Sequence, residues 1–200
     1  MEFHNYYRFV KSFYLVELHD IDFYLMKMYN CFIVEYHEKK EKRVIITFAG
    51  HRHITERDEI ACKLREQLLL LVSEEEKTLF YLGGYGEFDN LCLKVCRELK
   101  KDFPNTELVF VTPYITPNQQ TKMNEILSMR IYDSTIYPPI ENTPLRYAIS
   151  KRNEWMMSNA DIVVAYVKTK YGGAYTSLCV ARRKGKKIIN LSDCLKEVVL

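Results

Sequence analysis

Three short glycine clusters in this sequence stand where a phosphate-bearing ligand would be held. Each follows an apolar run typical of a buried strand, and together they hold six of the seven glycines: Gly50; Gly83, Gly84 and Gly86; Gly172 and Gly173. Glycine at such a turn can adopt positive φ and lets the backbone approach a ligand closely. A helix that begins there offers free N–H groups and partial positive charge to an anion. The clusters therefore predict a phosphate site, and tight turns without a ligand are the alternative interpretation.

Polar and aromatic side chains gather around the same turns and suit a nucleotide. Besides the glycines, the predicted ligand-binding residues are His51, Arg52, Tyr85, Glu87, Asp89, Pro113, Tyr114, Arg146, Arg152, Asn153 and Thr176. Arginine pairs bidentately with phosphate, carboxylates accept from ribose hydroxyls, and tyrosine stacks on a base. Simpler interpretations remain for two of them: His51 as a cap of the following segment, and Asp89 as a partner of a helix dipole.

The elements that must position these residues follow from residue 43 onward. Strand-like runs alternate with helical patterns: we predict strands at 43–49, 78–82, 107–112, 131–136, 161–167 and 187–191, and helices at 55–73, 87–101, 118–128, 145–158 and 174–184. Continuous apolar strands are typical of a parallel sheet that helices cover on both faces. The sequence therefore predicts a Rossmann-like, doubly wound α/β fold with its ligand beyond the carboxyl ends of the strands. Thr55 and Asp58 predict a capping box at the first of these helices.

The first 42 residues differ from the rest, since they contain 11 aromatic residues and neither glycine nor proline. We predict an N-terminal extension over residues 1–42, with a helix and a strand-like segment at 31–36, and a nucleotide-binding domain over 43–200. An aromatic surface of this size needs a cover, which the main domain or a second copy of the chain would supply, and we expect a dimer. A membrane-surface helix is a third interpretation, disfavoured by the interspersed acidic residues.

The amino-acid composition of the chain disfavours several classes of binding partner. A net charge of +3 without a long basic block disfavours nucleic acid as a partner. No apolar stretch approaches the roughly 18 residues of a membrane span and no secretory signal is visible, so we expect no membrane contact and a cytoplasmic location. The histidines and cysteines lack metal-ligand spacing, and the turn Gly83–Gly86 reads GGYG rather than GxGxxG. We therefore predict neither a metal nor a cofactor.

Several segments, taken in order, resemble the SLOG superfamily. They are Arg152–Met156 (RNEWM), Asp161–Ala165 (DIVVA), Gly172–Thr176 (GGAYT), Gly83–Asp89 (GGYGEFD) and Gly50–Arg52 (GHR). That superfamily includes the "Lonely Guy" cytokinin-activating phosphoribohydrolases and the DNA-processing protein A fold, and the glycine turns look closest to an uncharacterised bacterial branch. The resemblance covers about residues 43–192 and implies a Rossmann-like domain that binds a nucleotide or nucleotide-derived ligand.

One departure from the family pattern bears on catalysis. In the phosphoribohydrolases an arginine and a glutamate are tied to cleavage of the N-glycosidic bond; Arg152 matches the arginine, but Cys179 stands at the glutamate position. Because a carboxylate supports the oxocarbenium-like transition state, the resemblance implies binding or sensing without turnover, as in SLOG sensors of bacterial conflict systems. A phosphoribohydrolase or N-glycosidase that acts on nucleoside monophosphates, with Arg152, Glu87 and Asp89 as catalytic residues, is the first alternative. A protein-interaction module with a vestigial site is the second.

Overall fold

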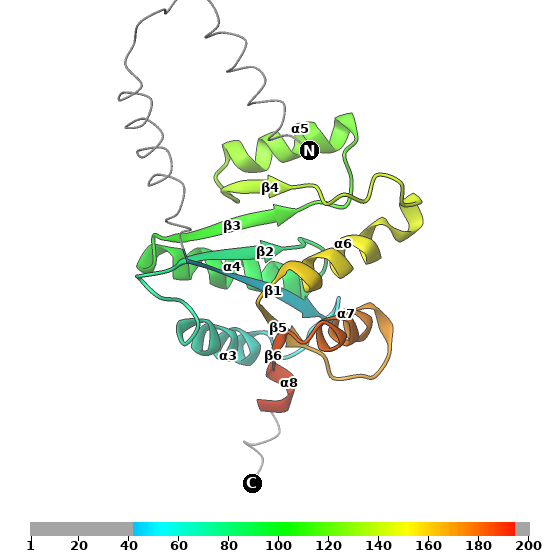
Figure 1. The fold of residues 1–200 in the computed structure, drawn as a ribbon. Coiled ribbons are helices and arrows are strands. Elements are labelled where there is room, and N and C mark those ends of the chain that lie inside the picture. Colours follow the sequence, from blue (N-terminus) through cyan, green and yellow to red (C-terminus); the bar gives the residue numbers. More distant parts are fainter. Residues whose placement is uncertain (1–41, 195–200) are drawn as a thin grey trace, which may run out of the picture. The chain divides into compact units, whose positions relative to one another are not determined.

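A computed structural model of the chain describes residues 42–194; the predicted N-terminal helix, strand and dimer surface of residues 1–41 lie outside the described residues. Six strands form one sheet in the order β4-β3-β2-β1-β5-β6 (Figure 1). Their bounds are β1 Arg43–Gly50, β2 Lys77–Leu82, β3 Thr106–Val111, β4 Ser134–Ile136, β5 Ile162–Tyr166 and β6 Lys187–Asn190. Every neighbouring pair is parallel.

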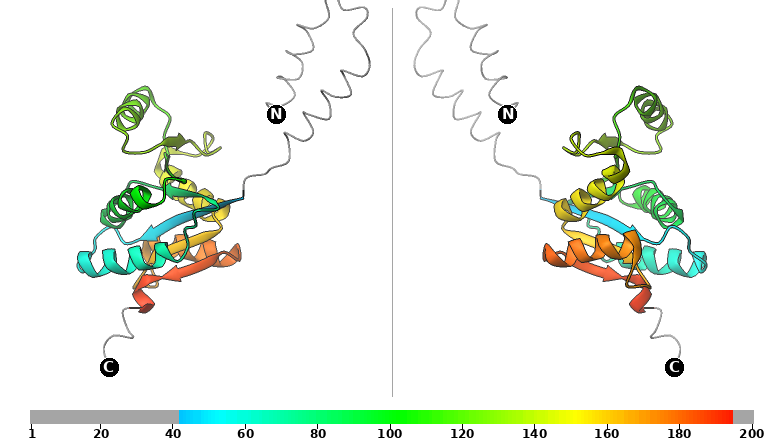
Figure 2. Two further views of the ribbon diagram at one scale, coloured as in Figure 1. Left: turned by 90° about the vertical axis from the view of Figure 1, so that its left-hand side faces the viewer. Right: turned by 90° about the vertical axis from the view of Figure 1, so that its right-hand side faces the viewer.

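Helices connect the strands and cover both faces of the sheet. They are α3 Arg57–Leu69, α4 Glu87–Asp102, α5 Pro117–Ser128, α6 Leu145–Asn159, α7 Gly172–Arg183 and α8 Leu191–Cys194. Edge-on views show α3 and α4 on one side of the sheet and α6 and α7 on the other (Figure 2). The predicted Rossmann-like, doubly wound α/β class is confirmed.

The apolar core consists of two clusters, one on each face of the sheet. Strand β1 contributes to both, because successive side chains of a strand point to opposite faces. Ile46 and Phe48 are buried in the cluster that holds the apolar stripes of α3 and α4. Ala49 is buried in the cluster that holds Met156 of α6 and Leu178 of α7.

The strand order reverses beside β1, which is where ligands of such folds bind. From β1 the chain proceeds through β2 and β3 to β4, and then returns across the sheet through α6 to place β5 on the other side of β1. The register pairs Gly50, the last residue of β1, with Tyr166, the last residue of β5. The loops that follow these two strands therefore leave the sheet side by side.

The start of α3 differs from the prediction. Its N-cap is Glu56, and no side chain caps it, so the predicted Thr55–Asp58 capping box is wrong. The physical reason is that Thr55 lies one residue too early, while the Glu56 carboxylate accepts hydrogen bonds from Tyr166 and Lys168 instead. The short helix α8 was not predicted. Within residues 42–194, no helix combines the length and the apolar character that a bilayer crossing requires.

Candidate functional site

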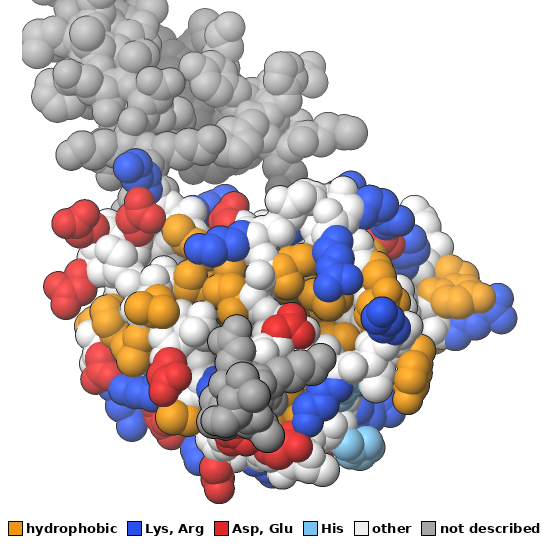
Figure 3. Space-filling model, turned by 90° about the horizontal axis from the view of Figure 1, so that it is seen from below, with side chains coloured by type: hydrophobic (Ala, Val, Ile, Leu, Met, Phe, Trp, Pro, Cys, Tyr) orange, Lys and Arg blue, Asp and Glu red, His pale blue; other side chains and the backbone are white. Residues whose placement is uncertain are grey.

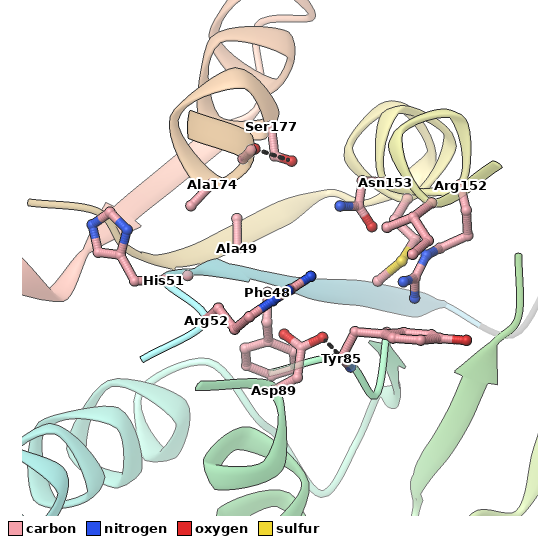
Figure 4. A pocket seen from close by; sticks show the side chains of 15 residues that line it. Phe48, Ala49, His51, Arg52, Tyr85, Asp89, Arg152, Asn153, Ala174 and Ser177 are labelled. Carbon is pink, nitrogen blue, oxygen red and sulfur yellow. Dashed lines mark hydrogen bonds between the residues drawn. The ribbon is translucent and has the colours of Figure 1, made fainter. Parts of the chain in front are cut away.

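A cavity of about 330 Å³ opens at the carboxyl edge of the sheet, where the loops after β1 and β2 meet α6 and the start of α7 (Figure 4). The structure brings these predicted residues together in its wall: Gly50, His51, Arg52, Gly83, Tyr85, Asp89, Arg152, Asn153 and Gly173. Other predicted residues do not line it: Gly84, Gly86, Glu87, Pro113, Tyr114, Arg146, Gly172 and Thr176. Ser177, beside the third glycine cluster, also lines it, as do five residues that sequence reasoning missed: Phe48, Ala49, Ile149, Met156 and Ala174.

Arg152 of α6 is the most buried charged side chain of the cavity wall, with 1% of its surface exposed. Its Nη1 donates to the Val111 carbonyl oxygen at 2.9 Å, and its guanidinium lies 5.2 Å from the centre of the Tyr85 ring. Its Nε is buried and has no hydrogen-bond partner among the described residues. Burial lowers the pKa of Arg152, and the neighbouring Asp89 charge opposes that shift. Buried donors are almost always paired in proteins, either with protein atoms or with ordered water.

Asp89, in the first turn of α4, is the carboxylate of the cavity wall. Its Oδ2 accepts the backbone N–H of Tyr85 at 2.9 Å, which folds the glycine turn back onto the helix. Burial raises the pKa of Asp89, and the Tyr85 bond and the Arg152 charge oppose the rise. A Cβ on Gly83 would lie 2.5 Å from Arg152 Nη1 and 2.9 Å from Asp89 Oδ2. Glycine at this position therefore makes room for two side chains of the site.

The glycine clusters differ in what they accommodate. A Cβ on Gly50 would lie 2.1 Å from Cδ1 of Phe88, so glycine there is required by the core. Gly84 has a φ of +73° and would place a Cβ 2.8 Å from the Phe110 ring. At Gly172 and Gly173, in contrast, a Cβ would meet no atom within 4 Å. Only this third cluster leaves open space in front of its backbone, as an approaching ligand requires.

Glu87 does not line the cavity, and the loop after β1 engages its carboxylate. Its Oε2 accepts the Ile54 backbone N–H at 2.9 Å, and Arg57 and His53 approach the carboxylate at 3.5 and 3.6 Å. The bond from Ile54 is the main cause that lowers the pKa of Glu87. Glu87 thus braces the loop after β1.

The remaining predicted residues outside the wall have local partners. Arg146 places its guanidinium 4.7 Å from the centre of the Tyr147 ring. Thr176 donates its hydroxyl to the Gly172 carbonyl oxygen at 3.1 Å. Tyr114 accepts a hydrogen bond from the Thr112 hydroxyl at its carbonyl oxygen.

Arg52 and the start of α7 supply the positive side of the cavity. Arg52 is exposed, and Figure 4 shows its side chain reaching into the cavity from the loop after β1. Within residues 42–194 no carboxylate forms an ion pair with it. The N-cap of α7, Tyr171, makes no side-chain capping bond, so the first N–H groups of that helix stay open. Two arginines and one aspartate line the wall, and their balance favours an anion.

His51 joins the cavity wall to the loop after β5. Its Nε2 accepts the backbone N–H of Lys168 at 2.9 Å, and its own backbone N–H donates to the Tyr166 carbonyl oxygen at 3.3 Å. Burial, and then the Lys168 charge, lower the pKa of His51. The neutral ring that accepts at Nε2 carries its proton on Nδ1.

Comparison with known proteins shows the fold. No family model and no curated protein matches the chain. DNA processing protein A from Streptococcus pneumoniae matches with a TM-score of 0.50 and 11% identity over 72% of this chain and 49% of that chain. DNA processing protein A from Helicobacter pylori, described for its single-stranded DNA binding mode, matches with a TM-score of 0.48 and 15% identity over 72% of this chain and 63% of that chain. The chain thus spans about half to two thirds of their length. The predicted resemblance to the DNA-processing protein A fold is confirmed at the level of the fold.

One prediction about partners is wrong. Net charge led us to disfavour nucleic acid, yet a protein of similar fold is described as binding single-stranded DNA. The physical reason is that net charge sums the whole chain, whereas the binding of nucleic acid depends on how charge is distributed locally. On the face shown in Figure 3, acidic and basic side chains are interspersed, so a small net charge says little about any one site. Within the described residues, no group of three potential ligands could hold a metal ion.

Proposed function

We propose that the cavity binds the phosphate-bearing unit of a nucleotide and does not cleave it. The observation that carries this proposal is that Arg52, the buried Arg152 and the start of α7 converge on one cavity. A buried guanidinium costs stability unless each of its donors is paired. An anion in the cavity would compensate this buried charge.

The surrounding groups suit the parts of a nucleoside monophosphate. The open backbone at Gly172 and Gly173 and the exposed Arg52 would hold the phosphate. The Tyr85 ring, 38% exposed, offers a surface for the base. Asp89 keeps an oxygen for a ribose hydroxyl, since Tyr85 engages only Oδ2. A volume of about 330 Å³ lies at the lower end of the range of small-ligand pockets, and this size favours a single nucleotide unit.

The arrangement of carboxylates argues against turnover. Glycosidic hydrolysis requires a carboxylate that stabilises positive charge at the sugar or activates water. Glu87 is engaged by Ile54 and Arg57 outside the cavity, and Cys179 is not among the lining residues. Asp89 alone remains, and burial disfavours its ionised form.

Calorimetric titration with adenosine, guanosine, cytidine and uridine monophosphates tests the proposal. We expect at least one to bind, and Arg52→Ala to weaken it about ten- to a hundredfold, the usual effect of losing a charged hydrogen bond. Arg97→Ala is the matched control, because it removes the same charge from the exposed side of α4. Absence of binding across the panel, or equal losses in both variants, would contradict the proposal.

Two further arms separate the alternatives. A single-stranded oligonucleotide carries the same groups, and the Helicobacter pylori protein of similar fold is described as binding single-stranded DNA. One outcome is that the oligonucleotide binds, with an affinity that Arg52→Ala lowers, while mononucleotides do not compete with it. In that case the cavity binds a nucleotide within a single strand rather than a free mononucleotide. Release of free base from any monophosphate would show that the protein is an enzyme, and it would overturn the proposal that the nucleotide is bound without cleavage. The cytoplasmic location and the dimer stay predictions.

A further inference from the structure

The loop between β5 and α7, residues 167–171, leads directly into the open glycine pair at the cavity. Its first residue is anchored firmly: Val167 donates to Asn190 Oδ1 at 3.0 Å, and its carbonyl oxygen accepts from Asn190 and Ser192. Beyond Val167, the bond from Lys168 N–H to His51 Nε2 is the one hydrogen bond that a backbone N–H of this loop makes within the described residues. This bond therefore ties the backbone of the loop to His51 in the cavity wall.

We propose that His51 is a positioning residue: it holds the β5–α7 loop, and with it the start of α7, through a bond that only the neutral imidazole can make. A protonated ring carries hydrogen on both nitrogens and cannot accept from Lys168 N–H. Protonation of His51 thus breaks the hydrogen bond between His51 and the Lys168 N–H, which we call the latch. The latch is a property of the fold without ligand, and only its consequence for nucleotide binding rests on the proposed function.

The charged and titratable groups around His51 favour its neutral state. Lys168, on the latched loop, is the charged residue that acts on it directly, and burial adds to the effect, so the pKa of His51 lies below its usual value. On β5, the Tyr166 ring packs edge-on with its centre 6.2 Å from that of His51. In the loop after β1, Arg52 and His53 directly follow His51.

A second contact of the same loop does not titrate in the relevant range. The Lys168 ammonium donates to both carboxylate oxygens of Glu56, at 3.0 and 2.8 Å, and the Tyr166 hydroxyl donates to Oε2 at 2.7 Å. These bonds lower the pKa of Glu56 to about 2. Since Glu56 stays ionised above roughly pH 5, it anchors the Lys168 side chain but cannot switch the loop in weak acid.

The sign of the pH effect follows from the direction of the shift. A histidine whose pKa is depressed in the folded state stabilises that state above its unfolded pKa, and the contribution is lost as the pH falls through the folded pKa. The latch is therefore closed at neutral pH and opens below the ordinary histidine value of about 6.5.

Amide hydrogen exchange at Lys168, followed by NMR without ligand and corrected for the intrinsic rate, tests the latch. In the wild type we expect the protection of this amide to fall roughly three- to tenfold between about pH 7.5 and pH 5, the range for one hydrogen bond. His51→Gln keeps an acceptor that cannot titrate, and its protection should not depend on pH. His51→Ala should show low protection throughout. Glu56→Gln is the matched control, and it should keep the pH dependence of the wild type.

Each result bears on the proposal. The buried amides of Val163 and Val164 in β5 serve as an internal reference that each variant is folded. Protection of Lys168 that stays constant with pH in the wild type would overturn the latch, and so would an equal fall in His51→Gln. Loss of the pH dependence in Glu56→Gln would assign the latch to the carboxylate instead. None of these measurements involves a nucleotide. The latch proposal can therefore be refuted while the proposed function stands, and the proposed function can be refuted while the latch proposal stands.

Discussion

Replacement of Arg152 by methionine should leave the stability of the fold nearly unchanged while it abolishes nucleotide binding. The substitution removes one charged hydrogen bond, from Nη1 to the Val111 carbonyl oxygen, which stabilises by about 1.5–3 kcal/mol. It also removes the unpaired buried Nε, which costs about 1–3 kcal/mol, and part of the penalty for burying a charge. Methionine replaces the apolar stem of arginine and omits the guanidinium. Because the terms oppose each other, we expect a net change within about 1.5 kcal/mol.

Urea unfolding followed by tryptophan fluorescence measures this change. The chain has one tryptophan, Trp155, and its ring stacks on Tyr81 with centres 5.7 Å apart, so its emission reports on the core between α6 and β2. Leu99→Ala, at a fully buried position of α4, provides the scale, since such truncations cost about 2–5 kcal/mol. Nucleotide binding by the methionine variant is then measured at a concentration at which the variant is folded.

A loss of stability as large as that of Leu99→Ala would refute the reasoning. Arg152 would then be a structural anchor for β3, with its Nε satisfied by water, rather than a ligand group. Unchanged nucleotide affinity in a stable methionine variant would refute it equally.

Three further substitutions separate the roles of the site residues. Gly173→Ala should match or slightly exceed the wild type in stability, because its Cβ meets open space in a helix, yet it should weaken nucleotide binding in the same titration. Gly50→Ala should cost at least about 1–3 kcal/mol in urea unfolding, because its Cβ would overlap the Phe88 ring. Asp89→Asn keeps an acceptor for Tyr85 and should raise the unfolding midpoint at neutral pH; since burial raises the pKa of Asp89, this gain should vanish below about pH 4.

The strands and helices could be predicted because their signals are local. Continuous apolar runs marked the strands, and glycine or proline marked most of the breaks. The exception at β4 shows the limit: we expected a strand over 131–136, but the pairing begins at Ser134. Tyr132 packs instead on Phe110, with ring centres 5.1 Å apart, and the Asp133 carboxylate accepts the Leu108 N–H at 2.7 Å. The Asp133 side chain thus replaces a backbone hydrogen bond of the sheet, and no sequence pattern predicts this replacement.

The positions of the site residues could be predicted, but their directions could not. Residues at the carboxyl ends of parallel strands must meet at one edge, so the glycine turns and Arg152 lie together. Whether a side chain faces the cavity depends on contacts with distant segments. Glu87 and Asp89 are two residues apart in one helical turn, yet Ile54 engages the first outside the cavity and the second lines its wall. The spacing of two residues along a helix predicts that they lie on different faces. It does not predict which of these faces lines the cavity.

The same contacts explain why no single motif could identify this site. The unpaired Nε belongs to α6, the room for its guanidinium is provided by Gly83 after β2, and the open backbone belongs to α7. Each segment alone is an ordinary helix start or turn. Only the crossover that returns the chain to β5 beside β1 brings them to one cavity. The proposed affinity for an anion therefore depends on the topology, and a substitution that moves α6 relative to β2 should weaken nucleotide binding even if it changes no residue of the cavity wall.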